Sequence, residues 1–234
     1  MSTASHVKEI DSLMESASRA LVHTRYFEAE RLAEEALAAA RSSGDFDRMS
    51  RILLPLQEAR RQRVQQALDV GAVTLVTAPI TEEMPIERGC YLIQPPQVGA
   101  DARRLRLMAL EREIPVAVLC REPKTKLGLC PVVAISPGMT MRTCVDPPQD
   151  WDNPDLPWFA QAMELLGEHA IESIDPALAV LKRLDALLLR LDALPEHESL
   201  HQALEQTCRE ALREQMAESA PRKSAERDGG CAPE

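Results

Sequence analysis

The segment from 88 to 145 constrains the fold most, because it holds the clearest strand signals in the chain. The apolar runs Tyr91–Gln94 and Ile114–Cys120 are too short and too rich in β-branched residues for helices. Between them, residues 100–113 carry apolar side chains at helical spacing, with Asp101 as a capping residue. Strand, helix and strand in this order predict a βαβ unit with a right-handed crossover and two parallel strands.

Three further strands complete the expected sheet. Pro131–Ile135 and Met139–Val145 are separated by Pro137-Gly138, a typical turn pair. The polar link 121–129 is short for a crossover, so we expect these two strands to return antiparallel. Val73–Thr77 can add one more strand. The result is a small mixed sheet with helices against at least one face.

Amphipathic helical patterns precede the sheet. Helices are predicted over residues 5–22, Tyr26–Arg41 and Phe46–Leu68. Gly44 is the expected left-handed cap of the second helix. Pro55 lies inside the third, and because proline removes a backbone hydrogen bond, it predicts a kink or a break there.

Helical patterns also follow the sheet. After a proline-rich connection over 146–157, a helix is predicted from Phe159 to Ile174, and Asp175-Pro176 is a start signal for the next. Leucines and other apolar residues from Leu181 to Met216 then predict an antiparallel helical hairpin. Its apolar stripe could also serve a homo-oligomer, although packing within the chain is favoured.

These patterns predict an α+β fold, with helical hairpins at both ends of a small mixed sheet that contains the βαβ unit. The expected regions are a helical one over 1–70, a central α/β one over 71–148, a C-terminal helical one over 149–218, and a disordered tail over 219–234.

The stretch 26–37 resembles the second half of a tetratricopeptide repeat. Ala17, Ala29 and Ala36 have the family's spacing of small residues where two antiparallel helices touch, and Tyr26 occupies the usual aromatic position at the turn. The resemblance implies a helical hairpin and, in the family, a protein-binding surface.

The match covers roughly residues 10–60, and it departs from the family at three positions. Leu13, Thr24 and Arg41 stand where Trp, Gly and Pro are common. Repeat arrays normally need about three units for stability. This segment of about one and a half repeats is therefore expected to pack on the rest of the chain.

Charge and composition favour some classes of protein over others. The net charge of −10 disfavours a general nucleic-acid binder, since phosphate repels such a field. The cluster Arg60-Arg61-Arg63 is interpreted as a solvated helix face. No run of about 18 apolar residues predicts a membrane span, and Met1–Ile10 lacks the features of a signal peptide. None of the 6 cysteines forms a CxxC pair, so we expect a reduced, cytoplasmic protein.

No motif predicts a catalytic residue, a metal ligand or a cofactor. His197 and His201 are four residues apart, a spacing that can hold zinc, but a third ligand is not evident and a chance pair on a helix is favoured. Cys120 and Cys130 lie at strand ends, and nothing in the sequence places His169 beside either thiol.

One edge of the expected sheet is a candidate ligand site. If the two strands of the βαβ unit are parallel, the loops 94–99 and 121–126 lie together at their carboxyl ends, where open α/β sheets tend to bind ligands. The second loop is basic in an acidic protein, so an anion is the natural guest. The candidate residues are Gln94, Gln97, Gly99, Arg121, Lys124 and Lys126. The alternative is an ordinary polar loop.

Trp151 and Trp158 lie in or near the proline-rich connection that follows the sheet. We expect their rings to fix this loop to the core, and a ligand-stacking surface is the alternative.

Two functions remain open. The repeat resemblance and the lack of a catalytic set favour a non-enzymatic protein-interaction or scaffold role, with another protein as partner. The alternative is a sensor or enzyme for a small anionic ligand, with its site near Gln94 and Arg121.

Overall fold

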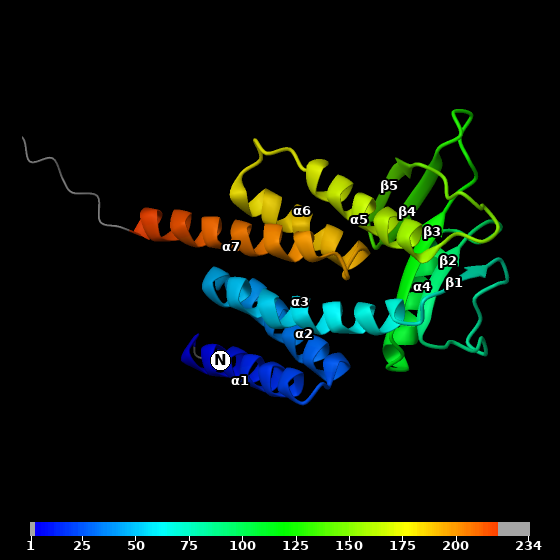
Figure 1. Ribbon diagram of the computed structural model, residues 1–234. Helices are drawn as coiled ribbons and strands as arrows, with labels where there is room; N and C mark the ends of the chain where they lie inside the picture. Colours follow the sequence, from blue (N-terminus) through cyan, green and yellow to red (C-terminus); the bar gives the residue numbers. More distant parts are fainter. Residues whose placement is uncertain (1–2, 220–234) are drawn as a thin grey trace, which may run out of the picture.

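The computed structural model describes residues 3–219, and the predicted tail over 219–234 lies almost entirely outside them. Figure 1 shows a helical body beside a sheet. The helices are α1 (Thr3–Val22), α2 (Tyr26–Ser43), α3 (Phe46–Leu68), α4 (Gly99–Glu111), α5 (Leu156–Glu172), α6 (Val180–Ala193) and α7 (Glu198–Ser219). The strands are β1 (Val73–Val76), β2 (Gly89–Ile93), β3 (Val116–Arg121), β4 (Cys130–Ser136) and β5 (Met139–Val145). The predicted α+β fold is confirmed.

The sheet has the order β1-β2-β3-β4-β5. β1, β2 and β3 are parallel, and β2 pairs with β3 from Gly89↔Val116 to Ile93↔Cys120. The predicted βαβ unit is therefore present, with α4 as its crossover. The strands β4 and β5 are antiparallel, as expected from the turn at Pro137-Gly138.

The two halves of the sheet separate beyond a short contact. β3 and β4 pair only at Cys120↔Val133 and Arg121↔Val132, at the carboxyl end of β3. The wedge between the strands is lined by side chains from α4, α5 and the end of α6. Arg121 thus lies where the parallel and antiparallel halves are still joined.

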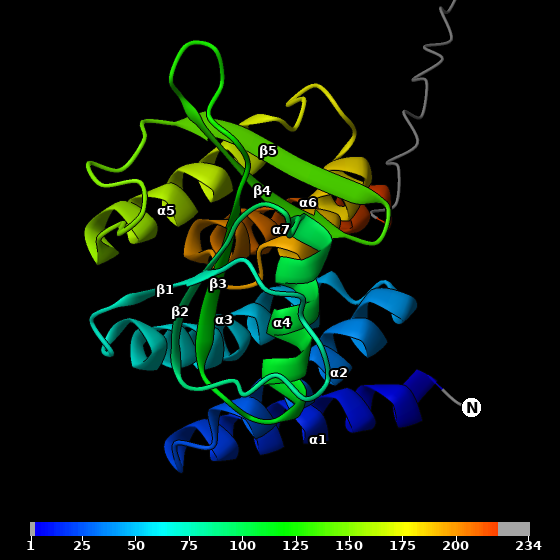
Figure 2. The same ribbon diagram turned by 90° about the vertical axis from the view of Figure 1, so that its right-hand side faces the viewer.

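Helices cover both faces of the sheet. Ile93, Cys120 and their neighbours pack against α4, whereas Leu92 and Leu119 pack against α5 and the end of α3. This alternation follows from the period of two in a strand. Figure 2 shows α4 to the right of β2 and β3, and α5 above β1, to the left of β4 and β5.

The helical body forms its own hydrophobic cluster. α1 packs on α2, α2 on α3, and α3 on α7, which also packs on α6. One cluster joins buried residues of the first helices, such as Ile52 and Leu56, with Leu184 and Leu204 near the C-terminus. The N-terminal helices therefore pack on the rest of the chain.

Two helix boundaries correct the sequence prediction. α3 continues through Pro55 without the predicted break, since the helix assignment is unbroken from Phe46 to Leu68. α6 begins at Val180 instead of after Asp175-Pro176. The Asp175 carboxylate accepts a hydrogen bond from the Ala177 amide at 2.9 Å, so Asp175-Pro176 starts a turn. The predicted left-handed cap at Gly44 is present, with φ of 67°.

Candidate anion-binding site

The carboxyl end of β3 places Arg121 in the interior. Its side chain is 0% exposed. Gln94 follows β2 directly, and because Leu92 and Leu119 point to the same face, Gln94 and Arg121 also share that face. The Arg121 Nε donates a hydrogen bond of 2.9 Å to the Gln94 Oε1, and Nη2 donates to the same oxygen.

The loop before α5 covers this guanidinium. Arg121 Nη2 donates to the Trp151 carbonyl at 2.7 Å, and its Cζ lies 3.8 Å from the centroid of the Trp151 ring. The Lys124 Nζ lies over the same ring at 4.5 Å. Both cations gain from the negative face of the indole. Trp151 therefore fixes the loop to the core, and its ring lies over the buried guanidinium.

Arg121 has no carboxylate partner within residues 3–219. No ion pair joins it to an Asp or Glu, and the neighbouring Glu122 pairs with Arg142 at 2.7 Å. The Nη1 atom of Arg121 is buried and makes no hydrogen bond to any described group. Burial lowers the pKa of Arg121 from its usual value. An arginine nonetheless stays charged in proteins, so a positive charge is buried here with no described carboxylate in ion-pair contact, and the opposite charge that acts on it, that of Asp152, does so from a greater distance.

The other buried arginine without a carboxylate, Arg190, differs in one respect. Its Nε donates to the Ala170 carbonyl at 2.6 Å, Nη1 to the Ala186 carbonyl at 2.9 Å, and Nη2 to the Ser173 hydroxyl at 3.0 Å. All its nitrogens are thus satisfied, two of them by groups at the end of α5, where a cation is favoured. Arg121 alone of the pair keeps an unpaired donor.

The structure brings together only some of the six candidate residues. Gln94, Arg121 and Lys124 meet around Trp151. The amide of Gln97 turns away and donates to the Thr77 carbonyl at 3.2 Å. Lys126 is exposed and forms no ion pair with a described residue.

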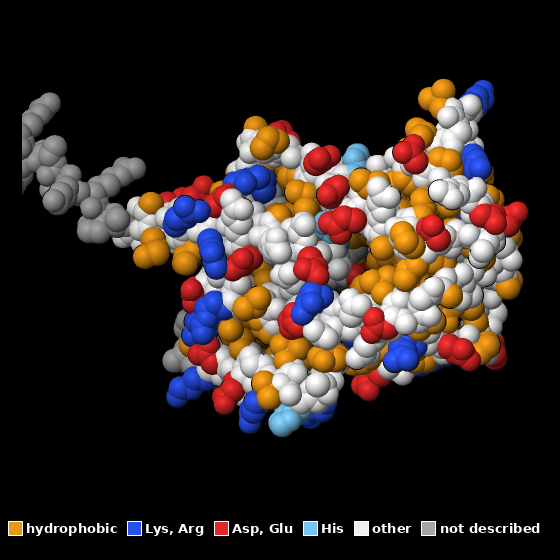
Figure 3. Space-filling view, viewed as in Figure 1, with side chains coloured by type: hydrophobic (Ala, Val, Ile, Leu, Met, Phe, Trp, Pro, Cys, Tyr) orange, Lys and Arg blue, Asp and Glu red, His pale blue; other side chains and the backbone are white. Residues whose placement is uncertain are grey.

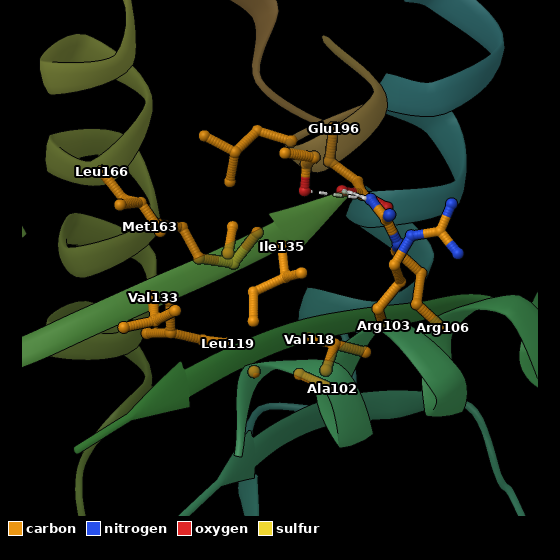
Figure 4. A pocket seen from close by; sticks show the side chains of 14 residues that line it. Ala102, Arg103, Arg106, Val118, Leu119, Val133, Ile135, Met163, Leu166 and Glu196 are labelled. Carbon is orange, nitrogen blue, oxygen red and sulfur yellow. Dashed lines mark hydrogen bonds and ion pairs between the residues drawn. The ribbon is translucent and has the colours of Figure 1, made fainter. Parts of the chain in front are cut away.

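Gly99 has a packing role on the other side of the sheet. A Cβ atom built on it would lie 2.8 Å from the Ile135 Cδ1, so the start of α4 approaches β4 closely. Gly99 also lines the small cavity in the wedge between β3 and β4, which holds about 30 Å³ and is shown in Figure 4. Arg106 and Glu196 form an ion pair of 3.7 Å at the margin of this cavity. Gly99 is therefore not part of the Arg121 cluster.

The thiol nearest this cluster is unreactive. Burial raises the pKa of Cys130 to about 11, although Arg121 and Lys124 act in the opposite direction. Burial also raises the pKa of Cys120 to about 12. Both are free thiols and behave as small apolar residues.

A buried ion network was missed from the sequence. Arg60 and Arg63 are each 6% exposed, so the expectation of a solvated Arg60-Arg61-Arg63 face is wrong for two of the three. Glu30, 2% exposed, lies 2.8 Å from both Arg60 and Arg63. Arg60 also pairs with Glu34 at 2.5 Å. Since α2 and α3 pack closely, these charges neutralise one another inside the helical body.

His201 belongs to the same network. Its Nδ1 lies 3.0 Å from the His197 carbonyl, which only accepts, and its Nε2 lies 3.2 Å from Arg60, which only donates. The proton is therefore on Nδ1, and both nitrogens are used. Burial and the Arg60 charge lower the pKa of His201 to about 3. This arrangement leaves no lone pair on His201 for the zinc considered from the sequence. Within residues 3–219, no group of three potential ligands could hold a metal ion.

Comparisons with known proteins add no assignment. No family model, curated protein or solved structure matches the chain. In the part of the chain that the structure describes, no helix has both the length and the apolar character needed to cross a bilayer.

Proposed function

We propose that the protein binds a small anion at the carboxyl edge of its parallel strands, with Arg121 as the principal contact. The observation that carries this proposal is the buried guanidinium that has, among the described residues, neither a carboxylate in ion-pair contact nor a partner for Nη1. Leaving a charge buried and unpaired costs several kcal/mol, on the order of 3–5. Proteins tolerate such local costs mainly where a function compensates for them.

The chemistry around Arg121 favours a compact oxyanion, such as a phosphate, sulfate or carboxylate group. A guanidinium donates to two oxygens of such a group at once, and Lys124 adds a second charge above the Trp151 ring. Because Arg121 is fully covered, the anion reaches it only when the loop 146–155 moves. Trp151 would then report binding through its fluorescence.

The test is a titration with phosphate, sulfate and acetate, followed by tryptophan fluorescence. Trp158→Phe leaves Trp151 as the single tryptophan of the chain. In that background, Lys124→Ala is expected to weaken anion binding about fivefold, since one charge-assisted contact is lost. Lys182→Ala, an exposed lysine on α6, is the matched control and leaves binding unchanged. Absence of a saturable signal with all three anions would refute the proposal.

A second function, docking of another protein on α1–α3, is supported by the repeat resemblance and by two exposed apolar side chains. Val22 and Leu54 are 80% and 70% exposed and are not needed by the core. A partner that uses this surface would be lost with Leu54→Asp and kept with Leu127→Asp, an equally apolar and 88% exposed position on the sheet side.

We further propose a cytoplasmic location, which the buried free thiols support.

A further inference from the structure

A cleft separate from the Arg121 cluster lies between the end of α3, α5 and the start of α7. It holds about 360 Å³, within the range of small-molecule sites. Its apolar wall consists of Val64, Leu68, Ala160, Met163 and Leu194. A ligand there could bury an apolar body of several carbon atoms against this wall.

One buried polar side chain of the lining lacks a partner. His197 is 7% exposed, and its Nδ1 makes no hydrogen bond to a described group. Its Nε2 lies 3.1 Å from the Glu164 carboxylate, close enough for an ion pair but poorly aligned for a hydrogen bond. Because a carboxylate only accepts, the ring proton belongs on Nε2. Nδ1 is then an acceptor without a donor.

The close approach of His197 to α5 depends on a glycine. A Cβ built on Gly167 would lie 2.1 Å from the His197 ring. The ring is therefore held against the helix backbone at the side of the cleft. This packing holds the ring against α5, and Nδ1 remains a hydrogen-bond acceptor without a donor among the described residues.

The charge of the lining has one sign. Glu164, Glu196 and Glu198 line the cleft, and no lysine or arginine of residues 3–219 does. Glu196 has Arg106 at 3.7 Å, and Glu198 accepts a 3.4 Å hydrogen bond from Gln57. Glu164 has only His197 among the described residues. Figure 3 shows acidic side chains grouped near the middle of the face where α5 and α7 lie beside α3.

We propose that this cleft binds a small organic cation, a primary ammonium group on an apolar body. The ammonium supplies donors only, which matches the carboxylate of Glu164 and, once the ring turns its covered Nδ1 toward the cleft, the unpaired acceptor on His197. The apolar body covers the wall formed by α3 and α5. A carboxylate of the same shape would meet like charge and find no donor, so the site selects by charge as well as by shape.

The test is isothermal titration of the full chain with hexylammonium and with hexanoate. Hexylammonium is expected to bind saturably with a Kd on the order of 1 mM, reasonable for so small a ligand. Hexanoate should bind at least about tenfold more weakly, because it is repelled by the three glutamates. The variant Glu164→Gln should weaken hexylammonium binding about fivefold. Glu168→Gln, one turn further along α5 and outside the cleft, is the matched control and should not change it.

A second readout follows the ring itself. On addition of hexylammonium, the Nδ1 resonance of His197 should shift in a nitrogen NMR spectrum, while that of exposed His23 stays in place. The proposal is overturned if the titration with hexylammonium does not reach saturation by about 20 mM, well above the Kd expected for a ligand of its size. It is equally overturned if hexanoate binds with the same Kd as hexylammonium. The same holds if Glu164→Gln and Glu168→Gln weaken hexylammonium binding by the same factor.

Discussion

The buried carboxylate of Glu30 gives the sharpest quantitative prediction. Its Oε1 accepts from Arg60 at 2.8 Å and from Arg63 at 3.1 Å, and the pair Glu30–Arg63 is closed to solvent. In Glu30→Gln the shape is kept but the charge is lost. Arg60 retains its ion pair with Glu34, whereas Arg63 keeps no direct ion pair among the described residues and has the Phe27 ring, 4.9 Å away, and the more distant charge of Glu34.

The Arg63 guanidinium is then left buried without a direct carboxylate partner among the described residues. Removing one member of a buried pair costs about 3–5 kcal/mol, a large part of the stability of a typical domain. With a urea m value of about 2.5 kcal/mol/M, the unfolding midpoint should fall by about 1–2 M. Circular dichroism during urea titration measures this shift directly.

The control is Glu35→Gln on the same helix. Its partner Arg31 and Glu35 itself are 63% and 50% exposed, so the loss should stay below about 1 kcal/mol. A Glu30→Gln variant as stable as Glu35→Gln would show that the network contributes nothing, and would refute the reasoning from burial.

Three further predictions concern other sites. Because the folded state holds the pKa of His201 at about 3, the unfolded chain binds more protons than the folded one as pH falls below about 6.5. The free energy of unfolding should therefore drop by about 2 kcal/mol between pH 7.5 and 5. In urea titrations at both pH values, His201→Gln should remove that drop. Gly167→Ala should cost about 1–3 kcal/mol, through its clash with His197, and His197→Ala in the same chain should recover part of the loss in thermal melts. A chain beginning at Gly71 lacks α3, which packs on α7, β2 and β3, and should show no cooperative melting transition; a normal melt would contradict a shared core.

The sheet was predictable because its signals are local. Short β-branched runs, a helix of about the right length between them and a Pro-Gly turn specify β2, α4, β3 and the β4–β5 hairpin without any long-range information. The meeting of Gln94 and Arg121 also follows locally. Each lies two residues beyond a core leucine, Leu92 or Leu119, so each points to the same face.

The covering of Arg121 was not predictable, because Trp151 arrives from a loop 30 residues away whose path has no period. Gln97 and Gly99 were assigned to the edge from sequence position alone. The backbone turns there into α4, and this turn directs Gln97 to Thr77 and packs Gly99 against Ile135.

The buried ion network of Glu30, Arg60 and Arg63 was partly predictable from the spacing of these residues relative to core positions. Arg60 and Arg63 stand four and seven residues after the core residue Leu56, and Glu30 stands three and seven residues before the buried Ala33 and Leu37. Opposite charges at core positions of two adjacent helices predict a buried pair. The clustering of three arginines in sequence favoured a solvated face instead. The packing of α3 on α7, in contrast, joins segments more than 130 residues apart and has no local signature.

The most direct test of the anion site is crystallisation with selenate, whose selenium can be located by anomalous scattering. We predict an anomalous peak beside the Arg121 Nη1, together with displacement of Trp151 from above the guanidinium. Crystals in which selenate binds elsewhere, and the Trp151 ring still lies over an Arg121 without bound anion, would contradict the proposed function.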